Sequence, residues 1–378
     1  PKEGTGLNPI LQDPALAIHP PILYIGYVGT SIIFSSSLAA LVCGMVNKIW
    51  AQHIKKWIIT SWIFLTIGIL LGSIWAYYEL GWGGFWFWDP VENVSLMPWF
   101  CLTALLHTII VLEKRNIYQS WTIILSIATF SLSMGGTFLV RSGILNSIHT
   151  FANDPSRGIF ILCFLFLLVL LAIFIFFIFQ KKLFKNLVKP LLVSKETAII
   201  VNNWFMMFFL SVVLIGTVYP IFLEVISGSK ISIGPPFYQK LMIPFLVPFL
   251  LFMALGPKLK WIKDNLSKIN LNQIISLILS IVISYLLVKL FGISYLFIIP
   301  LFAVGFFLLF STIKDFFSKN SSLSQKISHF AFSLFILSIL FNGIFAKEFS
   351  SNMKVGDERK FINKVIKFEN LKIIEKDN

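Results

Sequence analysis

Apolar stretches long enough to cross a lipid bilayer dominate this amino-acid sequence. A hydrocarbon core about 30 Å thick requires about 20 apolar residues in a helix, because no water is present there to pair with backbone polar groups. Ten stretches reach that length, at approximately residues 21–46, 57–79, 94–113, 119–140, 158–180, 198–225, 239–256, 272–289, 292–312 and 327–346. The sequence therefore predicts an all-α, polytopic integral membrane protein.

The composition agrees with this class. Of the 378 residues, 57% are hydrophobic and only 13% are charged, and the mean hydropathy is +0.85. A water-soluble domain of that composition could not cover its surface with polar groups. The net charge of +14 would suggest nucleic acid in a soluble protein. Here the lysines cluster in short runs between apolar stretches, which is a signal of membrane topology.

The distribution of these lysines predicts an orientation, because cytoplasmic loops of membrane proteins are enriched in Lys and Arg. The loops after the first, third, fifth, seventh and ninth stretches are basic and are assigned to the inner side. We expect residues 1–346 to form the transmembrane domain. The tail at 347–378 is assigned to the outer side, where its alternation of apolar and polar residues indicates strands.

An unusual aromatic loop lies on the predicted outer side, at residues 81–93. It places five rings within seven residues, beside two adjacent glycines; these rings are Trp82, Phe85, Trp86, Phe87 and Trp88. Broad apolar faces next to residues without side chains suit a flat ligand such as a porphyrin. An ordinary aromatic belt at the membrane surface explains the same rings equally well.

The end of this loop has the pattern of a helix start. Asp89 is expected at the N-cap, Pro90 at the first helical position and Glu92 at the third, which together form a capping box. The cap attaches the aromatic loop to the helix that follows. Asp89 and Glu92 are therefore interpreted as caps rather than as acid–base catalysts.

The five histidines fall into three groups. His19 and His149 are predicted at the outer face, where two neutral imidazoles could act as axial ligands of a porphyrin iron. His107 and His329 are predicted in the inner half of the membrane, and an intramembrane ionisable residue indicates a functional site. A hydrogen bond to a neighbouring helix is the simpler explanation for each of them. His53 is expected in a solvated inner loop and receives no role.

Arg141 is the exception to the charge bias, because it lies on the predicted outer side. Its guanidinium could pair with a porphyrin propionate, or it could anchor the end of a helix at the interface. The three cysteines lie inside apolar stretches and form no C-x-x-C or C-x-x-C-H motif. Disulfide exchange, zinc binding and covalent haem attachment to this chain are therefore not supported.

Several segments resemble the CcmF family, the haem lyase subunits of System I cytochrome c maturation. The tryptophan-rich WWD signature of that family corresponds here to WGGFWFWDPVEN at 82–93. Further similar segments are NPILQDPALAIHPP at 8–21, FLVRSGILNSIH at 138–149, DPSRG at 154–158 and GTVYPIFLEVISGSKISIGPP at 216–236. The resemblance is specific up to about residue 236 and weaker beyond it.

This resemblance implies two sites for haem b. His19 and His149 correspond to the outer histidines that flank the WWD loop and ligate haem delivered by the haem chaperone CcmE. His107 and His329 correspond to the ligands of a separate inner haem that receives electrons from quinol. The residues implied in contact with the outer haem are Trp82, Trp86, Trp88, Asp89 and Arg141.

The implied reaction joins haem covalently to a C-x-x-C-H site of apocytochrome c, with CcmH- and CcmI-type subunits as further partners. A bacterial inner membrane, or a mitochondrial inner membrane, is the implied location. Phe85 departs from the family, which usually has Trp there, and we expect the family's earliest spans and its last span to be missing. The alternatives are a haem transporter that loads the chaperone, similar to CcmC, and a solute transporter with an ordinary aromatic belt.

Overall fold

The computed structural model describes residues 12–80, 84, 86–144, 154–183, 190–228, 231–264, 271–292, 298–318, 321–346, 349 and 351–371. Within these ranges, ten helices are long and apolar enough to cross a membrane. The predicted class of an all-α, polytopic membrane protein is confirmed.

The helices are α1 (Pro14–Cys43), α2 (Lys48–Glu79), α3 (Pro90–Arg115), α4 (Gln119–Ser142), α5 (Pro155–Phe179), α6 (Lys195–Ser227), α7 (Pro235–Leu255), α8 (Leu271–Leu290), α9 (Ile298–Phe316) and α10 (Leu323–Phe345). Short 3-10 turns follow α5 at Gln180–Lys182 and α7 at Gly256–Lys258.

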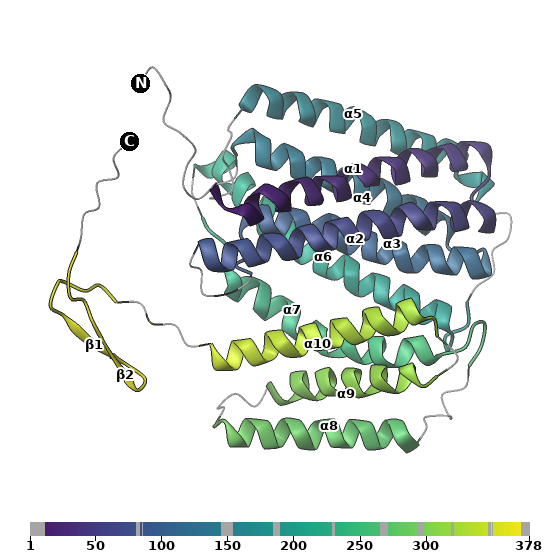
Figure 1. Cartoon of the computed structure of the whole chain (residues 1–378). Helices are drawn as coiled ribbons and strands as arrows, with labels where there is room; N and C mark the ends of the chain where they lie inside the picture. The colour runs from purple at the N-terminus through teal and green to yellow at the C-terminus, as the bar shows by residue number, and fades with distance from the viewer. Residues whose placement is uncertain are drawn as a thin grey trace.

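The helices pack in two groups (Figure 1). In the first group, α1 packs on α2 and α4, and α3 packs on α2, α4 and α6, while α5 covers α4. In the second group, α9 packs between α8 and α10. Helix α7 contacts both α6 and α9 and so connects the groups. The main apolar core lies in the first group and extends through α7 to α9 and α10.

Successive helices run in opposite directions between the two ends of the bundle (Figure 1). The starts of α1, α3, α5, α7 and α9 and the ends of α2, α4, α6, α8 and α10 lie at one end, on the left in Figure 1. The charge distribution predicts this end to be the outer one. The described part of the aromatic loop therefore lies at the same end as the start of α1 and the end of α4.

Helices α1 and α2 begin well before the apolar stretches predicted at 21–46 and 57–79, at Pro14 and Lys48. Helix α1 begins at Pro14, because the side chain of Asp13 accepts hydrogen bonds from the first free backbone N–H groups, as an N-cap does. His19 is therefore inside α1, whereas the first predicted stretch, at 21–46, leaves it outside the helix; that part of the prediction is wrong. In the same way, Asn47 caps α2. His53 consequently lies in a helix and not in a loop.

Close backbone contact between α1 and α2 depends on glycine. A Cβ atom at Gly26 would lie 2.8 Å from the backbone nitrogen of Leu65, and one at Gly68 would lie 2.7 Å from the Cα atom of Leu23. Neither distance is compatible with a side chain. Small residues at such positions let membrane helices approach each other closely, where van der Waals packing drives association.

The tail after α10 contains a β-hairpin. Strands β1 (Glu358–Phe361) and β2 (Lys364–Lys367) pair antiparallel, with Glu358 opposite Lys367. The Lys367 ammonium lies 3.0 Å from the Glu358 carboxylate across this pair. The alternation of apolar and polar residues in the tail thus correctly indicates strands.

Candidate functional site

The described part of the aromatic loop is held by a ring from a distant helix. The indole of Trp88 stacks on the phenol ring of Tyr238 in α7, with centroids 4.3 Å apart and planes at 7°. Trp86 meets Trp88 edge to face, at 6.1 Å and 88°. Trp88 has φ = 59°, a left-handed conformation that is uncommon for a bulky residue. Trp82 and Phe85 lie outside the described residues.

Tyr238 is itself fixed from two sides. Its side chain is buried, with 1% exposed, and its hydroxyl oxygen accepts a hydrogen bond of 3.0 Å from the Asn93 amide. The same Asn93 amide nitrogen lies 3.0 Å from the Trp88 carbonyl oxygen and donates to it. Gly216 of α6 makes room for the phenol, because a Cβ atom there would lie 2.7 Å from the ring.

The predicted capping box at the start of α3 is confirmed. The Asp89 carboxylate accepts from the Val91 N–H at 3.0 Å, and the Glu92 carboxylate accepts from the Asp89 N–H at 3.1 Å. Glu92 does more than the motif requires, because the same carboxylate oxygen accepts from the Phe87 N–H at 3.0 Å. Glu92 therefore fixes the backbone on both sides of Trp88.

His19 is held against α2 by two glycines. Its Nδ1 lies 2.7 Å from the carbonyl oxygen of Gly68. A carbonyl can only accept, so Nδ1 carries the proton and Nε2 is the nitrogen suited to a metal. At Gly72, a Cβ atom would lie 2.6 Å from the imidazole. The imidazole thus occupies a notch in α2 that only glycine can provide.

The other residues predicted at the outer site are described less completely. His149 lies outside the described residues. Arg141 is exposed in the last turn of α4, and its carbonyl oxygen accepts a hydrogen bond of 3.2 Å from the Asp154 N–H, which precedes α5. The exposed Arg141 thus lies at the end of the bundle that the charge distribution predicts to be outer.

The two histidines predicted in the inner half of the membrane lie in different helix groups. His107 on α3 and His329 on α10 are both half-buried. His107 Nδ1 donates to the Thr103 carbonyl at 2.8 Å, which directs Nε2 away from its own helix backbone. Phe332, one turn after His329, contacts Phe249 of α7, with centroids 6.4 Å apart.

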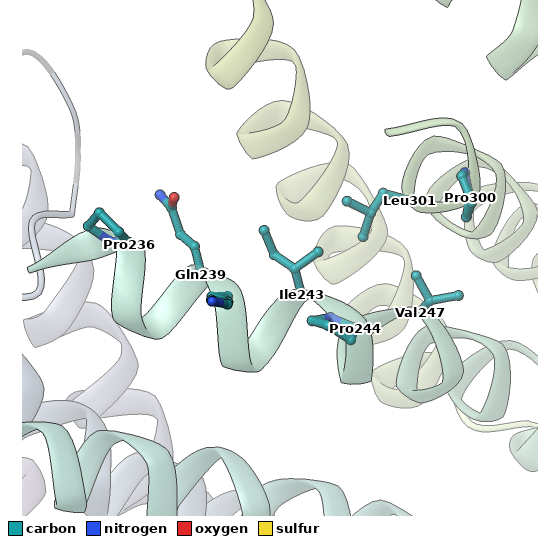
Figure 2. A pocket seen from close by; sticks show the side chains of 8 residues that line it. Pro236, Gln239, Ile243, Pro244, Val247, Pro300 and Leu301 are labelled. Atoms are coloured by element: carbon teal, nitrogen blue, oxygen red, sulfur yellow. The ribbon is translucent and has the colours of Figure 1, made fainter. Parts of the chain in front are cut away.

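A separate apolar groove of about 580 Å³ lies between α7 and α9 (Figure 2). Its lining includes Pro236, Ile243 and Pro244 of α7, and Pro300 and Leu301 of α9. No histidine is among its lining residues. We therefore assign no haem to this groove.

Comparisons with known proteins agree with the fold. A family model described as "Cytochrome C assembly protein" matches residues 1–149, which defines the class as polytopic membrane proteins of cytochrome c assembly. The chain is 49% identical to the "Cytochrome c-type biogenesis protein CcmF" of Pseudomonas aeruginosa, over 71% of this chain and 40% of that protein. It is 46% identical to the protein of the same name from Escherichia coli, over 77% of this chain and 45% of that protein. The chain belongs to the CcmF family.

A solved structure titled "Cytochrome c Heme Lyase CcmF" supports this assignment. It has a TM-score of 0.69 and 25% sequence identity to this chain, and the match covers 87% of this chain and 52% of that one. The chain spans about 40% of the length of the first curated relatives that it matches.

Several residues of the site carry no motif in the sequence. Tyr238 lies two residues after the family-like segment at 216–236, and its place after Pro236 and Phe237 is the only local signal. The role of Glu92 toward Phe87 was also missed, because a capping box predicts a bond to the N-cap residue alone.

Proposed function

We propose that this chain holds haem at its outer face and promotes covalent attachment of that haem to apocytochrome c. The observation that carries the proposal is the outer-end assembly of the His19 imidazole and the Trp86–Trp88 loop, in a chain of the CcmF family. His19 and His149 would ligate the iron, Trp82 and Trp86 would contact the macrocycle, and Arg141 would pair with a propionate. Asp89 holds the loop in place.

The described residues fit a haem at this position. The His19 imidazole has its proton on Nδ1, so its Nε2 has the form that iron requires. The indole N–H of Trp86 is buried and lacks a hydrogen-bond partner among the described residues. A buried donor of this kind costs about 1–3 kcal/mol, which a propionate or another ligand oxygen would offset.

Trp88 has a different role from Trp86. Tyr238 covers one face of Trp88, and the apolar cluster around Val94, Met97 and Val213 packs against it. Trp88 therefore positions the loop, and Trp86 is the ring better placed to meet a ligand. When bound, haem supplies the two vinyl groups to which the thiols of the C-x-x-C-H site add, and the chain itself needs no nucleophile.

A second haem b would bind at the inner pair, His107 and His329. Each imidazole comes from a different helix group and keeps accessible surface, as expected of two ligands that leave space for a macrocycle between them. The chain would use this haem to pass electrons from quinol and keep the outer iron reduced. Axial histidines and a buried setting are the usual means by which proteins tune such a potential.

The remaining partners follow from the same proposal. The haem chaperone CcmE would deliver haem at the outer face, and CcmH- and CcmI-type subunits would present the apocytochrome. The membrane would be the bacterial inner membrane or a mitochondrial inner membrane.

The test is covalent haem staining of the c-type cytochromes of the host after denaturing electrophoresis. We expect His19→Ala in the full chain to abolish the stained bands while the protein still inserts into the membrane. His53→Ala is the matched control, because His53 is exposed on α2 and belongs to neither site. Normal staining with His19→Ala would refute the assignment of the outer site.

A further inference from the structure

Two tryptophans face each other between the membrane-spanning helices α2 and α3, one on each helix. The indole rings of Trp62 and Trp99 stack with centroids 6.1 Å apart and planes at 29°. Each has an N–H group that needs an acceptor, because an unpaired donor is costly in an apolar setting. Trp62 donates to the Thr103 hydroxyl at 2.9 Å, and Trp99 donates to the Thr66 hydroxyl at 2.9 Å.

The two threonines complete a reciprocal arrangement. The Thr103 hydroxyl donates to the carbonyl of Trp99 at 2.7 Å, and the Thr66 hydroxyl donates to the carbonyl of Trp62 at 2.6 Å. Each helix therefore contributes one indole and one hydroxyl. We call these four residues the indole clasp. Its two halves are chemically equivalent.

Only one half of the indole clasp leads to a histidine. The carbonyl of Thr103 accepts the Nδ1–H of His107 at 2.8 Å. Thr66 has no corresponding imidazole partner among the hydrogen bonds of the described residues. The Trp62 indole therefore holds the side chain of Thr103, and the backbone carbonyl of the same residue holds the imidazole of His107.

The opposite side of this turn is also fixed. The Thr108 hydroxyl donates to the carbonyl of Ala104 at 2.8 Å, and the amide of Asn203 in α6 lies 2.6 Å from that hydroxyl. Thr108 and Asn203 are fully buried. In α3, α2 thus holds Thr103 and α6 holds Thr108. His107 lies between these two residues in the sequence.

We propose that Trp62 and Thr103 are positioning residues for His107, which set the orientation of its imidazole toward the iron of the inner haem. Groups behind a metal-ligating histidine fix its ring orientation and tautomer, and their loss costs about 10- to 100-fold in metal affinity. This inference rests on the proposed function, because it requires a haem at the inner pair. It adds two residues that touch neither iron nor porphyrin.

The symmetry of the indole clasp supplies the control. Thr103→Val and Thr66→Val each remove one hydroxyl that accepts from an indole N–H, of Trp62 and of Trp99 respectively. Each of these hydroxyls also donates to a backbone carbonyl. The purified full chain is compared for retention of the inner haem, for its visible spectrum and for its reduction potential. We expect Thr103→Val to weaken retention about 10-fold, to add high-spin character to the spectrum and to shift the potential, while Thr66→Val stays close to wild type.

Three further variants test the same inference. Thr103→Ser keeps the hydroxyl and should restore the wild-type spectrum and potential. Trp62→Phe keeps a ring in the stack but removes the N–H. It should therefore change haem retention, the spectrum and the potential in the same way as Thr103→Val does. Trp99→Phe should leave all three close to wild type. Equal effects of Thr103→Val and Thr66→Val would overturn the inference and leave the proposed function standing. Absence of an inner haem from the wild-type chain would instead overturn the proposed function, and the inference with it.

Discussion

Trp88 and Tyr238 form a face-to-face stack at 4.3 Å, and this contact connects the aromatic loop to the far helix α7. Because Trp88 has a left-handed backbone, the loop needs contacts of this kind to hold its conformation. The stack also determines which tryptophan ring is available to contact a ligand. One face of Trp88 is covered by protein, whereas Trp86 has an indole N–H that no described residue accepts.

The first prediction concerns this stack. Tyr238→Leu should lower the free energy of unfolding by about 0.5–1.5 kcal/mol for the aromatic pair alone, plus the lost bond to Asn93. Tyr238→Phe keeps the stack and should lose only the hydrogen bonds of the hydroxyl group, with Asn93 and with Thr217, at about 1 kcal/mol each. Thermal unfolding in detergent measures both. Tyr219→Leu, at an exposed tyrosine of α6, is the control, and a change as large as that of Tyr238→Leu would contradict the account.

The second prediction concerns the notch that holds His19. Gly72→Ala places a methyl group 2.6 Å from the imidazole, so the ring must move and the outer haem should be lost although every ligand is present. Gly343→Ala is the matched control, because a Cβ atom there meets nothing within 4 Å. The measurement is the outer haem content of the purified Gly72→Ala and Gly343→Ala chains. Equal haem content in the two variants would show that His19 does not need this position.

The third prediction separates the two acidic residues of the helix start. Asp89→Asn should change the free energy of unfolding by only a few tenths of a kcal/mol, because Asn caps about as well as Asp. Glu92→Ala should cost more, about 1–3 kcal/mol, because it leaves the N–H groups of Phe87 and Asp89 without their shared acceptor. Thermal unfolding compares the two variants. The reverse order would contradict the role given to Glu92.

The fourth prediction concerns Arg141. Its side chain is exposed at the outer end of α4, so Arg141→Gln should leave the fold intact. Loss of a charged hydrogen bond to a propionate should weaken the outer haem by about 1.5–3 kcal/mol. Titration of haem into the apoprotein measures this difference. Binding equal to wild type would identify Arg141 as a helix-end anchor instead.

The sequence predicts the number and nature of the membrane helices well, because their length and apolar composition are dictated by the bilayer. It predicts their ends less well. Asp13 and Asn47 start α1 and α2 before the apolar stretches begin, since a cap depends on local hydrogen bonding rather than on hydropathy. As a result, His19 and His53 both lie in helices, contrary to expectation.

The candidate site is likewise only partly predictable from the sequence. The capping box at Asp89 can be predicted because all of its members are neighbours in the chain. The roles of Tyr238 and Gly68 cannot be predicted, because these residues contact Trp88 and His19 only after distant helices have packed. The indole clasp had one available signal: Trp62 and Trp99 lie within apolar spans, where an indole N–H requires an acceptor.

The most direct test of the account is a reduced-minus-oxidised visible spectrum of the purified full chain and its histidine variants. We predict the bands of a low-spin haem with two histidine ligands, lost in His107→Ala and in His329→Ala and retained in His53→Ala. His19→Ala should remove only the contribution of the outer haem. A wild-type chain without haem bands, or bands that persist in both inner variants, would contradict the central claim that these imidazoles hold haem.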